Sequence, residues 1–278
     1  MTTIQSKAGS TPIDLHTTDS GGDGRPVVLI HGWPLSGDSW SAQRTALMEA
    51  GYRVITYDRR GFGRSEKPDD GYDYDTMSED LAAVMEEMDL RDAVIVGFSM
   101  GGGEVARYIG RHGSKRLAGA VFASAVPPYL LQTDDNPNGG LGKEDVEGMK
   151  DQLRSDRDAF FAGFAENFYT ADGDLKVDRG VIDRWREMAA PCSTDAALTC
   201  IDAFAMTDFR SDLDKVDVPT LVIHGAADGI VPIEVSGKRT ADTVRDSRFV
   251  TIDDGPHGVL DSHTDEFNRA LLEFLSSL

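Results

Sequence analysis

A serine with glycines two positions before and after it is the feature of this sequence with the clearest chemical potential. Ser99 is the centre of the motif Gly-Phe-Ser-Met-Gly at 97–101, between the apolar run 93–96 and a run with helical periodicity. Small neighbours allow a serine to occupy the tip of a sharp strand-to-helix turn. The helix N-terminus behind it stabilises developing negative charge. The pattern therefore predicts Ser99 as a nucleophile.

A serine hydroxyl needs a base, itself oriented by a third group, before it can attack a carbonyl. His257 follows the last expected strand and is predicted as that base, because it would emerge at the same sheet edge as Ser99. Asp228 follows an expected strand at 220–223 and is predicted as the orienting acid, since ligands bind at the carboxyl ends of strands in an open α/β sheet. Asp253 and Asp254 are closer to His257 in sequence, but short acidic residues at a strand end commonly serve the turn. The other histidines are interpreted as structural or surface residues: His16, His31, His112, His224 and His263.

Attack on a carbonyl also requires two donors for the oxyanion that forms. The Met100 N–H, directly after the nucleophile, is predicted as one donor. The second is expected from the loop after the first buried strand, where Gly32 allows close backbone approach and the Trp33 N–H can point inward. Pro34 has no N–H to donate.

The elements that would position these residues alternate between strands and helices. Short aliphatic runs predict strands at 27–30, 53–57, 93–96, 118–122, 220–223 and 249–252, and their lack of polar alternation indicates parallel strands covered on both faces. Two weaker segments, 3–6 and 13–18, are expected to form an antiparallel edge. Helices are expected at 40–50, 78–88, 100–112, 233–245 and 264–275, with Ser78 as a cap.

The alternation stops between 127 and 213, where the pattern predicts helices at 143–154, 157–169, 179–190 and 194–206. We interpret this stretch as an all-helical lid inserted into one α/β fold. The expected organisation is a core at 1–126 and 214–278, with the lid at 127–213.

Composition excludes several classes of function. The net charge of −20 disfavours nucleic acid and anionic membranes as partners. Cys192 and Cys200 are eight residues apart in a stretch with helical character, so they would lie about 12 Å apart along a helix axis, beyond disulfide reach. The sequence has no metal-ligand spacing, no signal peptide and no run long enough to span a bilayer, so we expect a cytoplasmic protein without a metal site. The oligomeric state stays open, a homo-oligomer included.

Together these motifs resemble the α/β-hydrolases, and within them the cofactor-free haloperoxidases, or perhydrolases, which are similar to bacterial aryl esterases. The resemblance covers both halves of the sheet and is weaker through the lid. The matching stretches are His31–Trp40, Tyr57–Ser65, Gly97–Tyr108, Ser124–Pro128, Val218–Gly225 and Gly255–Gly258.

The resemblance implies an eight-stranded, mostly parallel sheet with helices on both faces, and a Ser99, Asp228 and His257 triad that forms an acyl-enzyme without any cofactor. Water would release the acyl group, and hydrogen peroxide in its place would give a peracid that oxidises halide. The expected substrate is a small ester or carboxylic acid, held by residues chosen from family position: Pro34, Phe204, Ile230 and Val231. The alternatives are a lactonase or amidase on small cyclic substrates, or a ligand-binding protein on the same scaffold.

Overall fold

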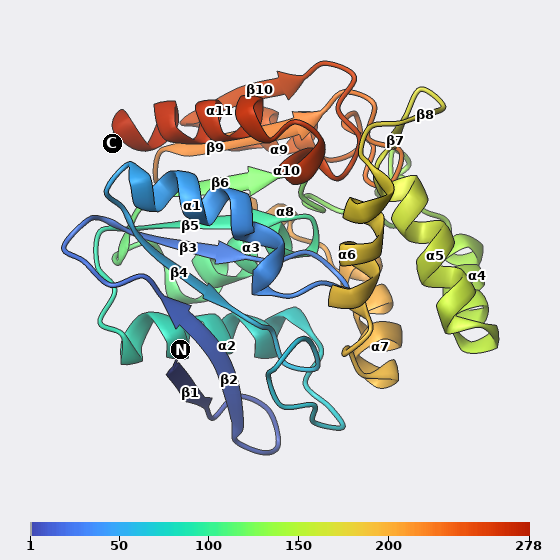
Figure 1. The fold of residues 1–278 in the computed structure, drawn as a ribbon, viewed down its shortest axis with the longest axis horizontal. Helices are drawn as coiled ribbons and strands as arrows, with labels where there is room; N and C mark the ends of the chain where they lie inside the picture. Colours follow the sequence, from blue (N-terminus) through green and yellow to red (C-terminus); the bar gives the residue numbers. More distant parts are fainter. Residues whose placement is uncertain (1) are drawn as a thin grey trace.

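The computed structural model describes residues 2–278, and its centre is an eight-stranded sheet (Figure 1). The strand order is β1-β2-β4-β3-β5-β6-β9-β10. The strands from β4 to β10 in this order are parallel, whereas β1 and β2 run antiparallel at one edge, as predicted. The strands are β1 (Thr2–Ser6), β2 (Ile13–Asp19), β3 (Pro26–Ile30), β4 (Arg53–Tyr57), β5 (Ala93–Phe98), β6 (Leu117–Ala123), β9 (Thr220–Gly225) and β10 (Ser247–Ile252).

Burial along the strands explains which of them are central. All six residues of β5 and all six of β9 are buried, because helices cover both faces of the sheet there. In β1 and β2, buried residues alternate with more exposed ones, so only one face of this edge is covered. The predicted mostly parallel sheet with covered central strands is confirmed.

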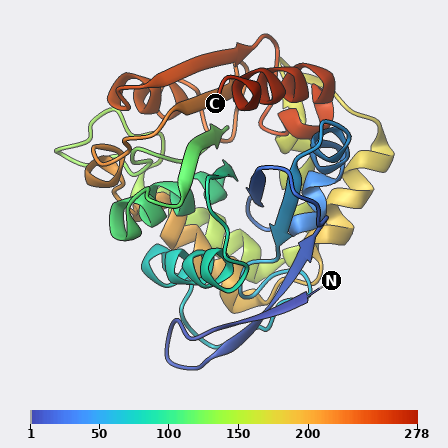
Figure 2. The ribbon, with the colours of Figure 1, turned by 90° about the vertical axis from the view of Figure 1, so that its left-hand side faces the viewer.

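Helices lie on both faces of the sheet (Figure 2). One face is covered by α1 and α11, which contact each other, with the short α10 beside them, and the other by α2, α3 and α9. Within residues 2–278, no helix combines the length and the apolar character needed to cross a membrane. The helices are η1 (Gly37–Trp40, a 3-10 helix), α1 (Ser41–Glu49), α2 (Tyr74–Glu87), α3 (Met100–His112), α9 (Gly237–Thr243), α10 (Val259–Ser262) and α11 (Thr264–Ser276).

Residues 143–206 of the segment between β6 and β9 stand beyond the end of the sheet toward which the parallel strands point (Figure 1). The four long helices of this segment match the predicted ones to within one residue at each end. The prediction that this segment is all-helical is wrong, because it also contains the hairpin β7–β8. Its elements are α4 (Lys143–Ser155), α5 (Arg157–Phe168), β7 (Thr170–Ala171), β8 (Asp174–Leu175), α6 (Arg179–Ala189), α7 (Thr194–Met206) and α8 (Arg210–Leu213).

Two helix predictions differ from the structure in their bounds. Helix α2 begins at Tyr74 rather than Ser78, because the Asp73 carboxylate accepts the Thr76 N–H and caps the helix there. The Ser78 hydroxyl instead donates to the Asp75 carbonyl within the helix. Helix α9 is shorter than the predicted 233–245, with bounds at Gly237 and Thr243.

Candidate active site

Ser99 occupies the turn between β5 and α3, with φ 54° and ψ −120°, a conformation that non-glycine residues rarely adopt. Glycine is required on both sides of this turn. A Cβ at Gly97 would lie 2.3 Å from the Gly101 carbonyl oxygen, and one at Gly101 would lie 2.4 Å from the Ile30 carbonyl oxygen of the neighbouring strand. The backbone segments approach so closely that only residues without a Cβ fit at these two positions. The turn presents the Ser99 hydroxyl above the sheet.

The structure brings together the three side chains predicted from distant parts of the sequence. His257 Nε2 lies 2.9 Å from Ser99 Oγ, and the His257 Nδ1–H donates to Asp228 Oδ2 at 2.7 Å. Both residues leave the carboxyl ends of neighbouring strands, Asp228 after β9 and His257 after β10. The geometry is that of a hydroxyl, a base and an orienting acid joined by hydrogen bonds.

The Asp228 carboxylate is held by donors on both of its oxygens. The N–H groups of Ile230 and Val231 donate to Oδ1 at 2.9 and 2.8 Å, while Oδ2 faces His257. His224 Nε2 lies 3.2 Å from Oδ2 and 2.8 Å from the Val231 carbonyl oxygen. Burial raises the pKa of Asp228, but the charge of His257 and the hydrogen bonds from the two histidines outweigh it and hold this pKa below its ordinary value. Asp228 is thus an ionised, immobile partner for the imidazole.

Aromatic rings confine the His257 imidazole. The Phe98 ring centroid lies 5.2 Å from that of His257, and the Phe168 ring meets it edge-on at 4.8 Å. His257 is 1% exposed. A buried imidazole between two rings keeps its orientation, so Nε2 stays directed at the Ser99 hydroxyl.

The predicted oxyanion donors lie at the entrance of the same turn. Within residues 2–278, neither the Met100 N–H nor the Trp33 N–H has a hydrogen-bond partner, so both are available to a substrate oxygen. The Trp33 indole is fixed, because its Nε1–H donates to the Ala197 carbonyl at 3.2 Å. Four rings of the inserted segment meet this indole at steep angles: Phe160, Phe161, Phe164 and Phe204.

A buried ion pair supports the loop that carries Trp33. Arg59 Nε lies 2.8 Å from Glu104 Oε2 with both side chains fully buried, and a second guanidinium nitrogen donates to the His31 carbonyl at 2.9 Å. The Arg59 N–H donates to His31 Nε2, while His31 Nδ1 donates to the Gly32 carbonyl. Burial, together with the Arg59 charge, lowers the pKa of His31 to about 3. His31 is therefore a neutral structural residue, as interpreted from the sequence.

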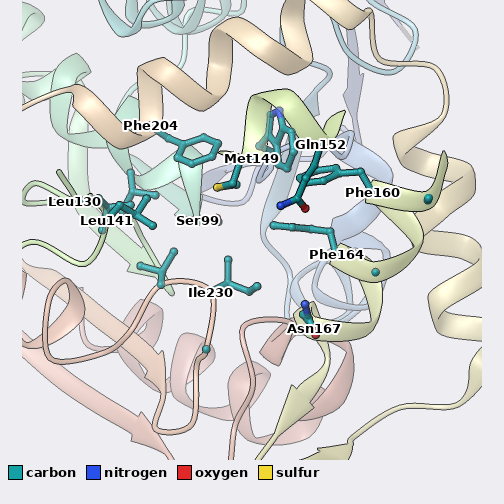
Figure 3. Close-up of a pocket in the computed structure, with 16 residues that line it drawn as sticks. Ser99, Leu130, Leu141, Met149, Gln152, Phe160, Phe164, Asn167, Phe204 and Ile230 are labelled. Atoms are coloured by element: carbon teal, nitrogen blue, oxygen red, sulfur yellow. The ribbon is translucent and has the colours of Figure 1, made fainter. Parts of the chain in front are cut away.

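A cavity of about 380 Å³ opens above Ser99 (Figure 3). Its wall has no ionisable side chain other than the Ser99 hydroxyl. Phe204, Ile230 and Val231, which were predicted to contact substrate, line it, whereas Pro34 is buried and is not part of its lining. The lining is Trp33, Ser99, Val126, Leu130, Leu141, Met149, Gln152, Ala159, Phe160, Gly163, Phe164, Asn167, Phe204, Gly229, Ile230 and Val231.

Among the wall residues that the segment 127–213 contributes, sequence reasoning singled out only Phe204 as a substrate contact. Phe160, Gly163, Phe164 and Asn167 are spaced i, i+3, i+4 and i+7 along α5, so they share one helix face, and this spacing could have identified them as a group. Met149 and Gln152 from α4 carry no comparable signal, because their position depends on how α4 sits over the sheet.

The alternative acids lie elsewhere. Asp254 pairs with Lys176 at 2.8 Å and with His263 at 3.2 Å, and no hydrogen bond joins it to His257. Asp253 is exposed. Within residues 2–278, histidine, cysteine and acidic side chains nowhere gather in threes or more as a metal ion would require.

Comparisons with known proteins agree with this geometry. Residues 25–264 match the family model described as the alpha/beta hydrolase fold. The chain belongs to the alpha/beta hydrolase family. This alpha/beta hydrolase is 45% identical to a protein named putative non-heme chloroperoxidase from Synechocystis, over 96% of both chains. It is 39% identical to a bifunctional esterase/perhydrolase from Acinetobacter calcoaceticus, over 95% of this chain and 97% of the other.

One solved structure has a higher sequence identity to this chain than these two relatives have. The crystal structure of a bromoperoxidase from Bacillus anthracis is 48% identical to this alpha/beta hydrolase, and its TM-score is 0.94 over 99% of this chain and all of the other. The relatives thus fall in the haloperoxidase and esterase group that the sequence motifs resemble, and the predicted eight-stranded fold with helices on both faces is confirmed.

Proposed function

We propose that this protein is a serine hydrolase that cleaves small carboxylic esters through an acyl-enzyme, and that it forms peracids when hydrogen peroxide replaces water. The observation that carries the proposal is the unbroken hydrogen-bond chain from Ser99, on the wall of an apolar cavity, through His257 to Asp228. The triad and the relatives named as esterase/perhydrolase and chloroperoxidase support the same chemistry.

Acylation follows from the positions of the hydrogen-bonding atoms. The substrate carbonyl carbon enters beside Ser99 Oγ, and His257 Nε2 accepts the hydroxyl proton as the new C–O bond forms. Asp228 keeps the other imidazole nitrogen protonated and balances the positive charge of the imidazolium. The N–H groups of Met100 and Trp33 hold the oxyanion. His257 then returns its proton to the departing alcohol.

Deacylation uses the same groups in reverse order. Water attacks the acyl carbon while His257 accepts its proton, and collapse of the intermediate returns that proton to Ser99 Oγ. Hydrogen peroxide reacts in the same way, because it also has an O–H proton that His257 can accept, and its oxygen is more nucleophilic than that of water. One of its oxygens then bonds to the acyl carbon and the product is a peracid. Every step is acyl transfer, so the triad and the two amides suffice.

The cavity wall selects the substrate class. Because no charged side chain lines it, an anionic or cationic substrate would lose its hydration without gaining a partner. We propose small neutral esters with an aliphatic or aryl group, contacted by Phe204, Ile230 and Val231. Pro34, beside the Trp33 donor, would shape the loop rather than touch the substrate. The segment 127–213 would act as a lid over the core formed by 1–126 and 214–278, since it supplies ten of the sixteen residues that line the wall.

Hydrolysis of p-nitrophenyl acetate tests the proposal. Wild type should release p-nitrophenol with turnover, and Ser99→Ala should retain about a millionth of the kcat, as expected for loss of a triad nucleophile. Ser155→Ala, at the exposed end of α4, is the matched serine control and should behave as wild type. With peroxide added, wild type should yield peracid and Ser99→Ala should not. Equal turnover by wild type and Ser99→Ala would refute the proposal.

A further inference from the structure

A methionine lines the same cavity as the nucleophile. Met149 extends from α4 into the space that Ser99 faces, with its sulfur directed inward (Figure 3). Among residues 2–278, Met149 is the only methionine that lines this cavity. Its side chain is partly buried. Other methionines provide a natural contrast, since Met48 and Met206 lie on the surface, 44% and 38% exposed.

A thioether is the most readily oxidised group in this wall. Methionine sulfur reacts with electrophilic oxygen donors to give a sulfoxide, and accessibility to the oxidant determines which methionine reacts first. Hydrogen peroxide alone reaches the surface methionines from bulk solvent more easily than it reaches Met149. A peracid differs, because it is formed inside the cavity at Ser99.

Confinement favours the internal reaction. One peracid molecule held in the 380 Å³ cavity corresponds to an effective concentration on the order of molar. Free peracid outside the protein is far more dilute. Met149 therefore meets the product at a concentration that Met48 and Met206 never experience.

We propose that Met149 is a site of self-oxidation by the peracid that the enzyme makes, an inference that rests on the perhydrolysis proposed above. The terminal peroxy oxygen transfers to the Met149 sulfur as the O–O bond breaks and an S–O bond forms. The thioether loses two electrons and becomes a sulfoxide. The peracid gains them and becomes the parent carboxylic acid, which keeps the peroxy proton.

The modification limits the activity that causes it. A sulfoxide places a strongly polar oxygen beside the apolar side chains of the wall, among them Leu130, Leu141 and Phe204. Binding of an apolar ester then displaces water from this oxygen, which weakens binding. Activity with peroxide therefore declines with the number of turnovers, and reduction of the sulfoxide restores it.

Peptide mass spectrometry tests the inference in the full-length protein. Wild type is incubated with p-nitrophenyl acetate and peroxide, with peroxide alone, and with the ester alone, and sulfoxide is quantified at Met149, Met48 and Met206. We expect Met149 to oxidise several-fold faster than the surface methionines only when both reagents are present. In Ser99→Ala with both reagents, Met149 should oxidise no faster than Met48.

A second readout follows the loss of activity. Met149→Leu, scored against its own initial rate, should survive several-fold more peroxide turnovers than wild type, whereas Met206→Leu should decay as wild type does. Peracid release and ester hydrolysis are both measured in the same samples. Peracid release without preferential Met149 oxidation overturns this inference and leaves the proposed function intact. Ester hydrolysis without any peracid overturns both the inference and the perhydrolase part of the function, while the esterase part stands.

Discussion

Replacement of Asp228 by asparagine separates the charge of the acid from its shape. The carboxylate Oδ1 accepts two main-chain N–H groups, from Ile230 and Val231, and Oδ2 accepts the His257 Nδ1–H. An amide retains only one acceptor oxygen. If its NH₂ faced the two main-chain N–H groups, both would lose their acceptor, at about 1–3 kcal/mol each. The amide oxygen will therefore stay on the main-chain side.

This orientation places the amide NH₂ against His257. The imidazole must then accept at Nδ1, which moves its proton to Nε2, the nitrogen that faces Ser99 Oγ. The histidine cannot deprotonate the serine in this tautomer. A triad histidine in the wrong tautomer lowers kcat about 10⁴-fold, and this corresponds to roughly 5 kcal/mol of transition-state stabilisation. Stability should fall much less, because every main-chain bond to residue 228 persists.

The assay is the kcat for p-nitrophenyl acetate at pH 7, with urea unfolding to confirm the fold. Asp254→Asn is the matched control, because it makes the same chemical change at the rejected candidate acid, which pairs with Lys176 and His263 instead. This control should keep kcat within about twofold and stability within about 0.5 kcal/mol of wild type. An Asp228→Asn variant with kcat within tenfold of wild type, or an inactive Asp254→Asn, would refute the reasoning.

Three further predictions concern the turn, a buried histidine and the cavity. Gly97→Ala should destabilise by at least about 3 kcal/mol in urea unfolding, since its Cβ would meet a carbonyl oxygen at 2.3 Å, whereas Gly148→Ala, with open space in α4, should gain about 0.5–1 kcal/mol. Burial lowers the pKa of His31 from 6.5 to about 3, so the unfolded chain binds a proton at this histidine first as pH falls. The free energy of unfolding should therefore decrease as the pH falls from about 6.5 toward 3. This decrease should be less steep in His31→Gln. Ile230→Ala should raise KM for apolar aryl esters about fivefold, from roughly 1 kcal/mol of lost contact, with little change in kcat; an unchanged KM would remove Ile230 from the substrate contacts.

The sequence predicts the core of this fold well because its signals there are local. Fully buried strands such as β5 read as aliphatic runs, and the glycines at 97 and 101 mark a turn that no larger residue could form. Chain order places Asp228 and His257 after neighbouring parallel strands, so topology alone predicts that they meet. The three side chains of the predicted triad are accordingly found within hydrogen-bond distance.

Competing local signals account for the errors in the secondary structure. Asp73 and Ser78 both suit a helix cap, and the structure uses Asp73 because its carboxylate reaches the Thr76 N–H. The hairpin β7–β8 was overlooked although Asp172 and Gly173 form a strong turn signal. Both residues have positive φ, as a two-residue hairpin turn of this kind requires.

The cavity wall could not be predicted because it depends on contacts between the inserted segment and the core. The Trp33 side chain packs against rings from α5 and α7, and the face of α5 that makes this contact also lines the cavity at Ser99. Periodicity reveals that Phe160 and Phe164 share a helix face, but it does not reveal what that face meets. Met149 enters the wall for the same reason, through the tertiary placement of α4.

A crystal structure with a serine-directed phosphonate bound would test the central claim most directly, because the phosphonate mimics the tetrahedral intermediate of acyl transfer. We predict a covalent bond from phosphorus to Ser99 Oγ, with a phosphoryl oxygen about 3 Å from the N–H groups of both Trp33 and Met100. Phosphorus attached to any other side chain, or a phosphoryl oxygen directed away from both amides, would contradict the account.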